Sequence, residues 1–312
     1  MYRSKNQIKR LTDSIFEKVL LVLTIISASF IVVILGVILK KGITPFITIN
    51  GGIGRVSFLK FITGFTWLSG EMFKSNLYGV GFIILYTLLI AFLSLLIALP
   101  IGVLTALFIA RVAPKRLKEV FRTIIELLAS IPSIIYGLFG AGVILKLIYN
   151  LSFMMGYQSK GGNSLLASVL VLSIMIIPTI TLISEVSIRS VDEKLIEASL
   201  ALGASSQQTN FKVVLSAAKS GIITSAILGI GRALGEATAI SLVIGNRKGG
   251  FSLNIFDTAS TLTTIMLEGM KETTGIDYDI RFSVGLVLMG IILITNFSLN
   301  KLKKMVGSID VK

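Results

Sequence analysis

The segment Gly229–Glu236 places two opposite charges in an otherwise apolar stretch. Arg232 and Glu236 are four residues apart, a spacing that puts both on one helix face, where they can form an ion pair. The planar guanidinium of arginine matches the geometry of a tetrahedral oxyanion. We therefore expect Arg232 to contact an oxyanion and Glu236 to position it. The alternative is a salt bridge that only joins two helices.

Two glycines of the same segment, Gly231 and Gly235, are also four apart. Small residues at this spacing permit the close approach of a second helix. The segment is not a dinucleotide-binding fingerprint, because no strand precedes it. The spacing would thus permit a close helix contact at these two glycines.

A second polar run, Ser130 to Gly140, interrupts another apolar stretch and contains Pro132. A proline in a membrane helix frees a backbone carbonyl, which nearby serines can satisfy. We predict that Ser130, Ser133 and Tyr136 form a polar strip along a substrate path. An ordinary proline kink is the competing interpretation.

A polar segment between two apolar stretches reads Glu197-Ala198-Ser199-Leu200-Ala201-Leu202-Gly203, and Val213-Val214-Leu215 begins ten residues after the glycine. A helix and loop of this kind between membrane helices is typical of a docking surface. Gly203 permits a backbone turn that a side chain would hinder. We predict that a soluble partner is bound by Glu197, Ala198, Gly203, Val213 and Leu215.

Several kinds of chemistry are excluded by residues that the chain lacks. It contains no histidine and no cysteine, which removes His-based triads, His-ligated and thiolate metal sites, and disulfides. The dipeptide Gly-Lys is absent, so no phosphate-binding loop for ATP can be written. We expect no catalytic residue, no metal and no cofactor in this chain.

The composition indicates a membrane protein: 54% of the residues are hydrophobic and 15% are charged, against about 25% charged in soluble domains. Apolar blocks long enough to cross a bilayer predict an all-α fold with six membrane helices. The first is too long for the core of a cleaved signal peptide. The six spans are expected at 19–39, 79–110, 124–148, 165–184, within 217–245, and 282–299.

The loops predict an orientation and a division of the chain. The net charge of +14 is explained mainly by Lys and Arg in cytoplasmic loops, and their scatter argues against nucleic-acid binding. We place the N-terminus and the loops around Lys115 and Glu197 in the cytoplasm, and Trp67 and Asp277 outside. The predicted parts are an N-terminal segment (1–18), a first helix with an outer loop (19–78), a five-helix core (79–300) with a coupling loop at about 185–216, and a tail (301–312).

Together these motifs resemble the permeases of phosphate-specific ABC importers, most closely the PstC branch. The resemblance covers nearly the whole chain and also rests on Tyr78-Gly79-Val80, Ile97–Gly102 and Ser241–Asn246. The docking segment departs from the family pattern at Ser199, Val213 and Ser216, where the family has Ala, Ile and Pro. The outer loop has Trp67-Leu68-Ser69 where the family has Trp-x-Pro.

The resemblance implies a multi-pass permease in a bacterial or archaeal cell membrane. It implies three kinds of partner besides membrane lipid: a PstA-like second permease, a dimer of a cytoplasmic PstB-like ATPase that holds ATP and Mg²⁺, and an external PstS-like phosphate-binding protein. Three other functions remain open at this stage. They are a permease for another oxyanion, an ion-coupled secondary transporter, which should show repeated halves, and an intramembrane enzyme.

Overall fold

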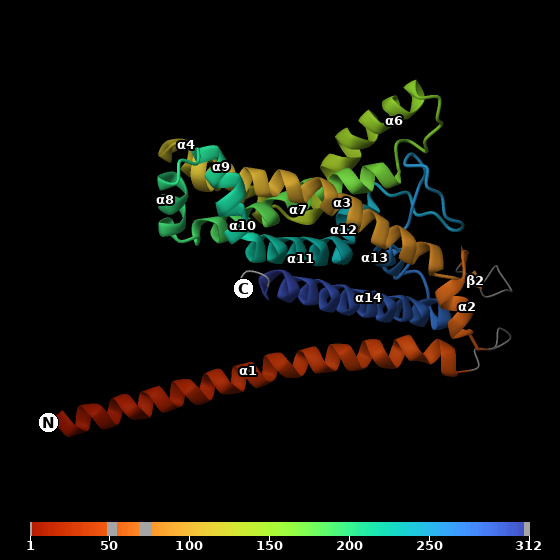
Figure 1. Ribbon diagram of the computed structural model, residues 1–312. Coiled ribbons are helices and arrows are strands. Elements are labelled where there is room, and N and C mark those ends of the chain that lie inside the picture. The colour runs from red at the N-terminus through yellow and green to blue at the C-terminus, as the bar shows by residue number, and fades with distance from the viewer. Residues whose placement is uncertain (1, 49–54, 69–76, 309–312) are drawn as a thin grey trace.

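The computed structural model describes residues 2–48, 55–68 and 77–308, with side chains described within 13–48, 55–68 and 77–305. Most of the described residues are helical, and the long helices of the bundle run side by side (Figure 1). The predicted all-α membrane fold is confirmed. Ser69 of the expected outer loop lies outside the described residues.

The helices and strands are numbered in their order along the chain. The α-helices are α1 (Tyr2–Ile47), α2 (Phe58–Thr63), α3 (Gly81–Leu107), α4 (Lys115–Ser130), α5 (Ser133–Phe139), α6 (Leu145–Met154), α7 (Leu165–Arg189), α8 (Glu193–Ala201), α9 (Ser206–Gln208), α10 (Leu215–Ala217), α11 (Lys219–Gly235), α12 (Thr238–Ser241), α13 (Leu262–Leu267) and α14 (Gly275–Ser308). Three π-helical turns continue helices: η1 (Phe108–Val112), η2 (Gly140–Ile144) and η3 (Thr209–Val214). The strands β1 (Trp67–Leu68) and β2 (Leu77–Tyr78) pair antiparallel.

Five helical segments within the described residues are long and apolar enough to cross a membrane: Asp13–Ile47, Gly81–Val112, Ser133–Met154, Leu165–Arg189 and Gly275–Met305. A sixth crossing results if the bent pair Ser206–Ala217 and Lys219–Gly235 counts as one span, its two parts meeting at 66°. The predicted start of the third span at Ile124 is wrong. α4 ends at Ser130, and Pro132 caps the start of a separate helix, α5, because proline lacks the N–H that would continue the first.

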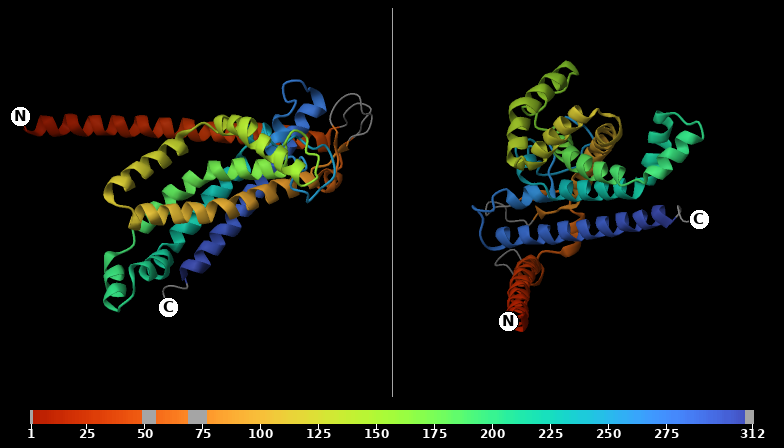
Figure 2. Two further views of the ribbon diagram at one scale, coloured as in Figure 1. Left: turned by 90° about the horizontal axis from the view of Figure 1, so that it is seen from above. Right: turned by 90° about the vertical axis from the view of Figure 1, so that its left-hand side faces the viewer.

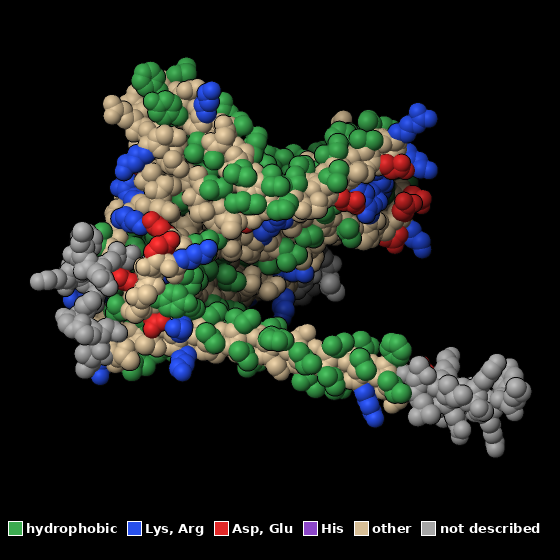
Figure 3. All heavy atoms as spheres, turned by 180° about the vertical axis from the view of Figure 1, so that it is seen from behind, with side chains coloured by type: hydrophobic (Ala, Val, Ile, Leu, Met, Phe, Trp, Pro, Cys, Tyr) green, Lys and Arg blue, Asp and Glu red, His purple; other side chains and the backbone are tan. Residues whose placement is uncertain are grey.

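The molecule has two chemically distinct ends. α8 lies at one end and β2 at the other (Figure 1), and we name them the α8 end and the β2 end. Helix α1 begins and α14 stops on the side of the α8 end. Hydrophobic side chains cover much of α1 and of the bundle, and charged side chains gather mostly towards the two ends (Figure 3). This distribution is the one expected of a chain whose middle lies in hydrocarbon.

Helix α1 stands apart from the bundle over most of its length. It lies beside α14 near the β2 end and diverges towards the α8 end, as two views show (Figures 1 and 2). Near the β2 end, Lys41 pairs with Asp279 at 3.0 Å, and the Ser283 hydroxyl donates to the carbonyl of Gly42 at 2.6 Å. No residue in its most apolar window is buried. That surface must therefore face lipid or another subunit.

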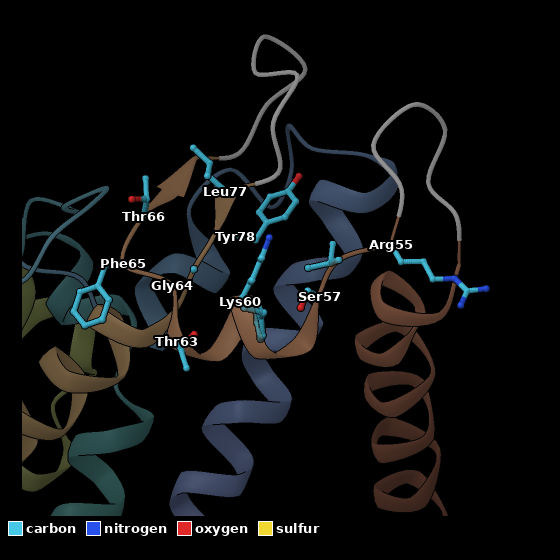
Figure 4. Close-up of a pocket in the computed structure, with 12 residues that line it drawn as sticks. Arg55, Ser57, Lys60, Thr63, Gly64, Phe65, Thr66, Leu77 and Tyr78 are labelled. Atoms are coloured by element: carbon cyan, nitrogen blue, oxygen red, sulfur yellow. The ribbon is translucent and has the colours of Figure 1, made fainter.

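The β2 end is closed by two long connections packed against each other. The backbone N–H of Trp67 donates to the carbonyl of Lys248 at 2.7 Å, and that of Gly250 donates to Phe65 at 2.8 Å. Tyr78 donates to Asp277, and burial together with this hydrogen bond raises the pKa of Tyr78 well above its ordinary value. A pocket of about 450 Å³ opens beside Tyr78 (Figure 4). The two segments expected to be outer loops therefore pack against each other at the β2 end.

Helix α11 packs against α7 through a row of small residues that we call the sealed row: Gly221, Ser225 and Gly229. A Cβ added at Gly221 would lie 2.0 Å from the Oγ of Ser187 on α7. Ser225 is fully buried, and the hydroxyl of Ser184 donates to its oxygen at 2.9 Å. These residues allow the two helix backbones to approach closely.

The close contact that the spacing permits at Gly231 and Gly235 is not formed among the described residues. We call these two glycines the open row, because no described atom outside the helix's own backbone lies within 4 Å of a Cβ added at either one. The same spacing of four residues therefore accompanies a tight contact in the sealed row and open space in the open row.

Candidate functional site

Arg232 lies beside the open row, in the last turn of α11. One of its terminal nitrogens, Nη1, donates to the hydroxyl of Thr179 on α7 at 2.7 Å. No other hydrogen bond or ion pair to Arg232 is formed among the described residues. A guanidinium carries five N–H donors in a fixed fork, so most of them remain available. The side chain borders a hollow of about 470 Å³ between α11 and α14.

Glu236 does not pair with Arg232 among the described ion pairs, so the predicted ion pair is wrong. α11 ends at Gly235, and the backbone of Glu236 is extended, with φ −74° and ψ 126°. Its carboxylate oxygen Oε1 accepts from the N–H of Ala239 and from the hydroxyl of Thr238, both at 2.9 Å. Glu236 therefore satisfies the N-terminus of α12, because the first N–H groups of a helix have no partner within it.

Ser133 joins this cap from a distant part of the chain. Its hydroxyl oxygen lies 2.8 Å from that of Thr238, which in turn donates to Glu236. A Cβ added at Gly137 would lie 2.8 Å from the Cα of Ala239, so α5 and α12 are in close contact. The structure thus brings Ser133 and Glu236 together through Thr238.

Tyr136 and Ser130 do not reach this cluster through their hydroxyl groups. The hydroxyl of the buried Tyr136 donates to the carbonyl of Leu128 at 2.7 Å. The hydroxyl of Ser130 donates to the carbonyl of Leu127, also at 2.7 Å. Both contacts satisfy backbone groups around the break at Pro132, which agrees with the proline-kink interpretation. A role for either residue in a substrate path stays a prediction.

The predicted docking segment is a short helix held by one buried side chain. Asp192 caps α8 by accepting from the N–H of Lys194 at 3.0 Å. Ile196 is buried in a small apolar cluster with residues of α3, α7 and η3. Glu197 and Ala198 are exposed, and Leu202 has 90% of its surface exposed. α8 therefore presents side chains outward while Ile196 fixes it to the bundle.

Gly203 ends this helix in the left-handed region, with φ +86°. No described atom outside its immediate neighbours lies within 4 Å of a Cβ added there, so the demand for glycine comes from the backbone alone. Val213 and Leu215 are half-buried on either side of the fully buried Val214. The contact of these residues with a partner stays a prediction.

The 66° bend after this segment forms without the family's proline at Ser216. The change of direction falls at Ala218, between α10 and α11, where φ is −82° and ψ is −4°. Ala218 is buried in the same apolar cluster as Ile196. Packing can therefore set the bend where no proline does.

Two functional candidates were missed by the sequence analysis. Thr179 follows Pro178 in the fourth span, and Thr238 stands two residues after Glu236. Polar residues within apolar stretches were a usable signal for both, but their partners lie 53 and 105 residues away along the chain. Among the described residues, no group of three or more acidic side chains could hold a metal ion.

Residues 98–304 match the family described as "Binding-protein-dependent transport system inner membrane component". The "Probable ABC transporter permease protein YqgH" of Bacillus subtilis is 40% identical over 86% of this chain and 82% of that protein. The "Probable phosphate transport system permease protein PstC" of Methanocaldococcus jannaschii is 32% identical over 93% of this chain and 94% of that protein.

A likeness in fold extends over almost the whole chain. A crystal structure of a bacterial alginate ABC transporter, in complex with an alginate-bound periplasmic protein, contains a chain that superposes with a TM-score of 0.65. The match covers 96% of this chain and 97% of that one at 19% identity. The secondary transporter and the intramembrane enzyme are therefore set aside. The chain belongs to the family of inner membrane components of binding-protein-dependent transport systems, the permease subunits of ABC importers.

Proposed function

We propose that this permease carries phosphate as the PstC-like half of an ATP-driven importer. The observation that carries the proposal is Arg232, a guanidinium inside a membrane helix with a single partner among the described residues, Thr179. A charge at this depth costs roughly 2.5–3.5 kcal/mol, so a role is expected of it. Its free donors suit a tetrahedral oxyanion, and relatives named as phosphate permeases support the choice of phosphate.

In this proposal Arg232 binds the anion directly and Thr179 orients the guanidinium. Glu236 acts indirectly, by fixing α12 against α5 through Thr238. A PstA-like permease supplies the other wall of the path, and a PstS-like protein delivers phosphate at the β2 end. A PstB-like ATPase dimer holds ATP and Mg²⁺ and docks on α8, which places the α8 end in the cytoplasm.

The test of the substrate is uptake of labelled phosphate in a strain without its own phosphate permease, complemented with this chain and its transport partners. We expect uptake that excess unlabelled phosphate abolishes and that excess sulfate or molybdate leaves unchanged. If labelled phosphate is not taken up but labelled sulfate or molybdate is, the substrate is another oxyanion and the assignment as an importer stands.

The coupling role of α8 is tested at Gly203. A β-branched residue is strained at φ +86°, so Gly203→Val should distort the end of α8 without a steric clash. We expect ATP hydrolysis and uptake to become uncoupled while the complex stays assembled. Gly36→Val provides a matched glycine substitution in helix α1, outside the hollow beside Arg232, where no described atom outside the helix's own backbone lies within 4 Å of the added Cβ. Normal coupled uptake by Gly203→Val would refute the assignment.

The orientation is tested by single cysteines, since the chain has none of its own. Lys115 at the start of α4 and Leu253 at the β2 end are both exposed. We expect an impermeant thiol reagent to label Leu253→Cys but not Lys115→Cys in intact cells. The reverse labelling pattern would show that the chain has the opposite orientation in the membrane.

A further inference from the structure

A second hollow continues the one beside Arg232 towards the α8 end. The first, about 470 Å³, is lined by Arg232, Asn296 and Asn300 among others. The second, about 510 Å³, is lined by Ser220, Asn300, Lys303 and Lys304. Asn300 borders both hollows, so they form one groove between α11 and α14. We call it the α11–α14 groove.

The groove has the length of half a bilayer. Twelve residues of α11 separate Arg232 from Ser220, which corresponds to about 18 Å at 1.5 Å per residue. Half of the hydrocarbon core is about 15 Å thick. The groove therefore connects the depth of Arg232 with the surface of the membrane at the α8 end.

Polar side chains line the groove beside apolar ones such as Ile227 and Leu228, and its charged side chains are all basic. None of the residues that line either hollow is acidic. Along α14, Asn296, Asn300 and Lys304 are spaced by four residues, so they lie on one helix face. No side-chain hydrogen bond to either asparagine is formed among the described residues. An amide without a partner is costly in hydrocarbon, so water or a ligand is expected beside both.

We infer that the α11–α14 groove is the inner half of the anion path, through which the oxyanion leaves Arg232 for the cytoplasm. This inference rests on the proposed function. The donors along it change in kind: a guanidinium at Arg232, neutral amides at Asn296 and Asn300, and then ammonium groups near solvent at Lys303 and Lys304. Neutral amides hold an anion less tightly than the guanidinium does, which favours its departure from Arg232, and the ammonium groups at the mouth keep the path attractive to anions.

The experiment uses single cysteines in the assembled complex, reconstituted in vesicles of neutral lipid. Asn296→Cys and Asn300→Cys place a thiol in the groove, and Phe297→Cys is the matched control on the same helix, 74% exposed and outside both hollows. A thiol in water reacts with a sulfonated thiol reagent, whereas one in lipid does not. We expect both groove thiols to react at least about tenfold faster than the control, because the basic lining concentrates anions.

Three further measurements test whether the transported anion occupies the groove. Phosphate supplied during turnover should slow the labelling of Asn300→Cys. The double change Lys303→Gln with Lys304→Gln should lower the preference for anionic over cationic reagents about tenfold, and Lys301→Gln, a lysine outside both hollows, should leave it unchanged. Vesicles with anionic lipid but no phosphate should give no protection.

The outcomes separate the groove from the identity of the substrate. Groove thiols no more reactive than Phe297→Cys, or reactive thiols that no transported anion protects, would overturn the groove as the path. Protection by anionic lipid alone would instead make it a lipid headgroup site and also overturn it. Protection by sulfate but not by phosphate would support the groove and refute phosphate as the substrate.

Discussion

The sealed row and the open row of α11 both place small residues four apart, but the sealed row makes a helix contact and the open row leaves space. In the sealed row, Gly221 and Gly229 bring α11 into contact with α7. In the open row, Gly231 and Gly235 leave space beside Arg232. A glycine in a membrane helix can therefore remove bulk to allow contact or to keep a passage clear. Only the position of the neighbouring helices distinguishes the two uses.

The largest effect is expected from a substitution that disrupts the sealed row. Gly221→Val would place side-chain atoms against Ser187, where even a Cβ lies 2.0 Å from Oγ and 2.3 Å from Cβ. Overpacking of this kind costs about 3 kcal/mol or more when the backbone must move. We expect loss of most of the assembled complex in detergent, measured by size-exclusion yield and by thermal unfolding.

The matched change in the open row is Gly231→Val. Since no described atom outside the helix's own backbone lies within 4 Å of its added Cβ, the free energy of unfolding should change by less than about 0.5 kcal/mol. A loss of assembly as large as that of Gly221→Val would show that protein covers the open row, and the contrast between the two rows would fail.

A smaller effect is expected at Thr179, which holds Arg232 beside the open row. Thr179→Val keeps the shape and removes the 2.7 Å hydrogen bond. Loss of a hydrogen bond worth about 0.6–1 kcal/mol corresponds to about a threefold to fivefold fall in phosphate uptake. Thr181→Val is the control, because that hydroxyl bonds only to its own helix, at Ile177. Equal losses in both variants would indicate a general effect on α7.

A small effect on stability alone is expected within the sealed row at Ser225. Ser225→Ala removes the acceptor of the Ser184 hydroxyl without changing the close approach of the helices. Interhelical hydrogen bonds in membrane proteins contribute about 0.6 kcal/mol. Chemical denaturation of the complex should show that the free energy of unfolding falls by this amount, and phosphate uptake should be unchanged. A loss of uptake without a loss of stability would place Ser225 on the substrate path instead.

The features that composition controls were predictable from the sequence. Apolar blocks located the six spans, counting the bent pair as one, because burial in hydrocarbon demands long apolar helices. The need for glycine at position 203 also followed from its place after α8, and its φ of +86° agrees. The start of α1, the helix α4 and the helix α8 lie on the same side of the molecule (Figure 1), whereas the cytoplasmic placement of that side stays a prediction.

The features that depend on tertiary contacts were not predictable. Arg232 and Glu236 have the spacing of an ion pair, but α11 ends between them, and the carboxylate caps α12 instead. Helix ends inside an apolar stretch leave little trace in composition. For the same reason, spacing alone could not show that Gly221 is in contact and Gly231 is not. Thr179 could be recognised only when α7 was placed beside α11.

The central claim is that Arg232 contacts the transported anion. An exchange of Arg232 and Glu236 cannot test it, because an arginine at position 236 could not accept the hydrogen bonds that cap α12. Arg232→Gln is the cleaner change, and Glu236→Gln, whose amide oxygen can still accept from Ala239, is the control. The measurement is phosphate uptake and thermal stability of the same reconstituted complex. Loss of a charge-assisted contact of about 2 kcal/mol predicts about a 30-fold fall in uptake by Arg232→Gln with stability unchanged. Full uptake, or a fall that only follows a loss of assembly, would contradict the account.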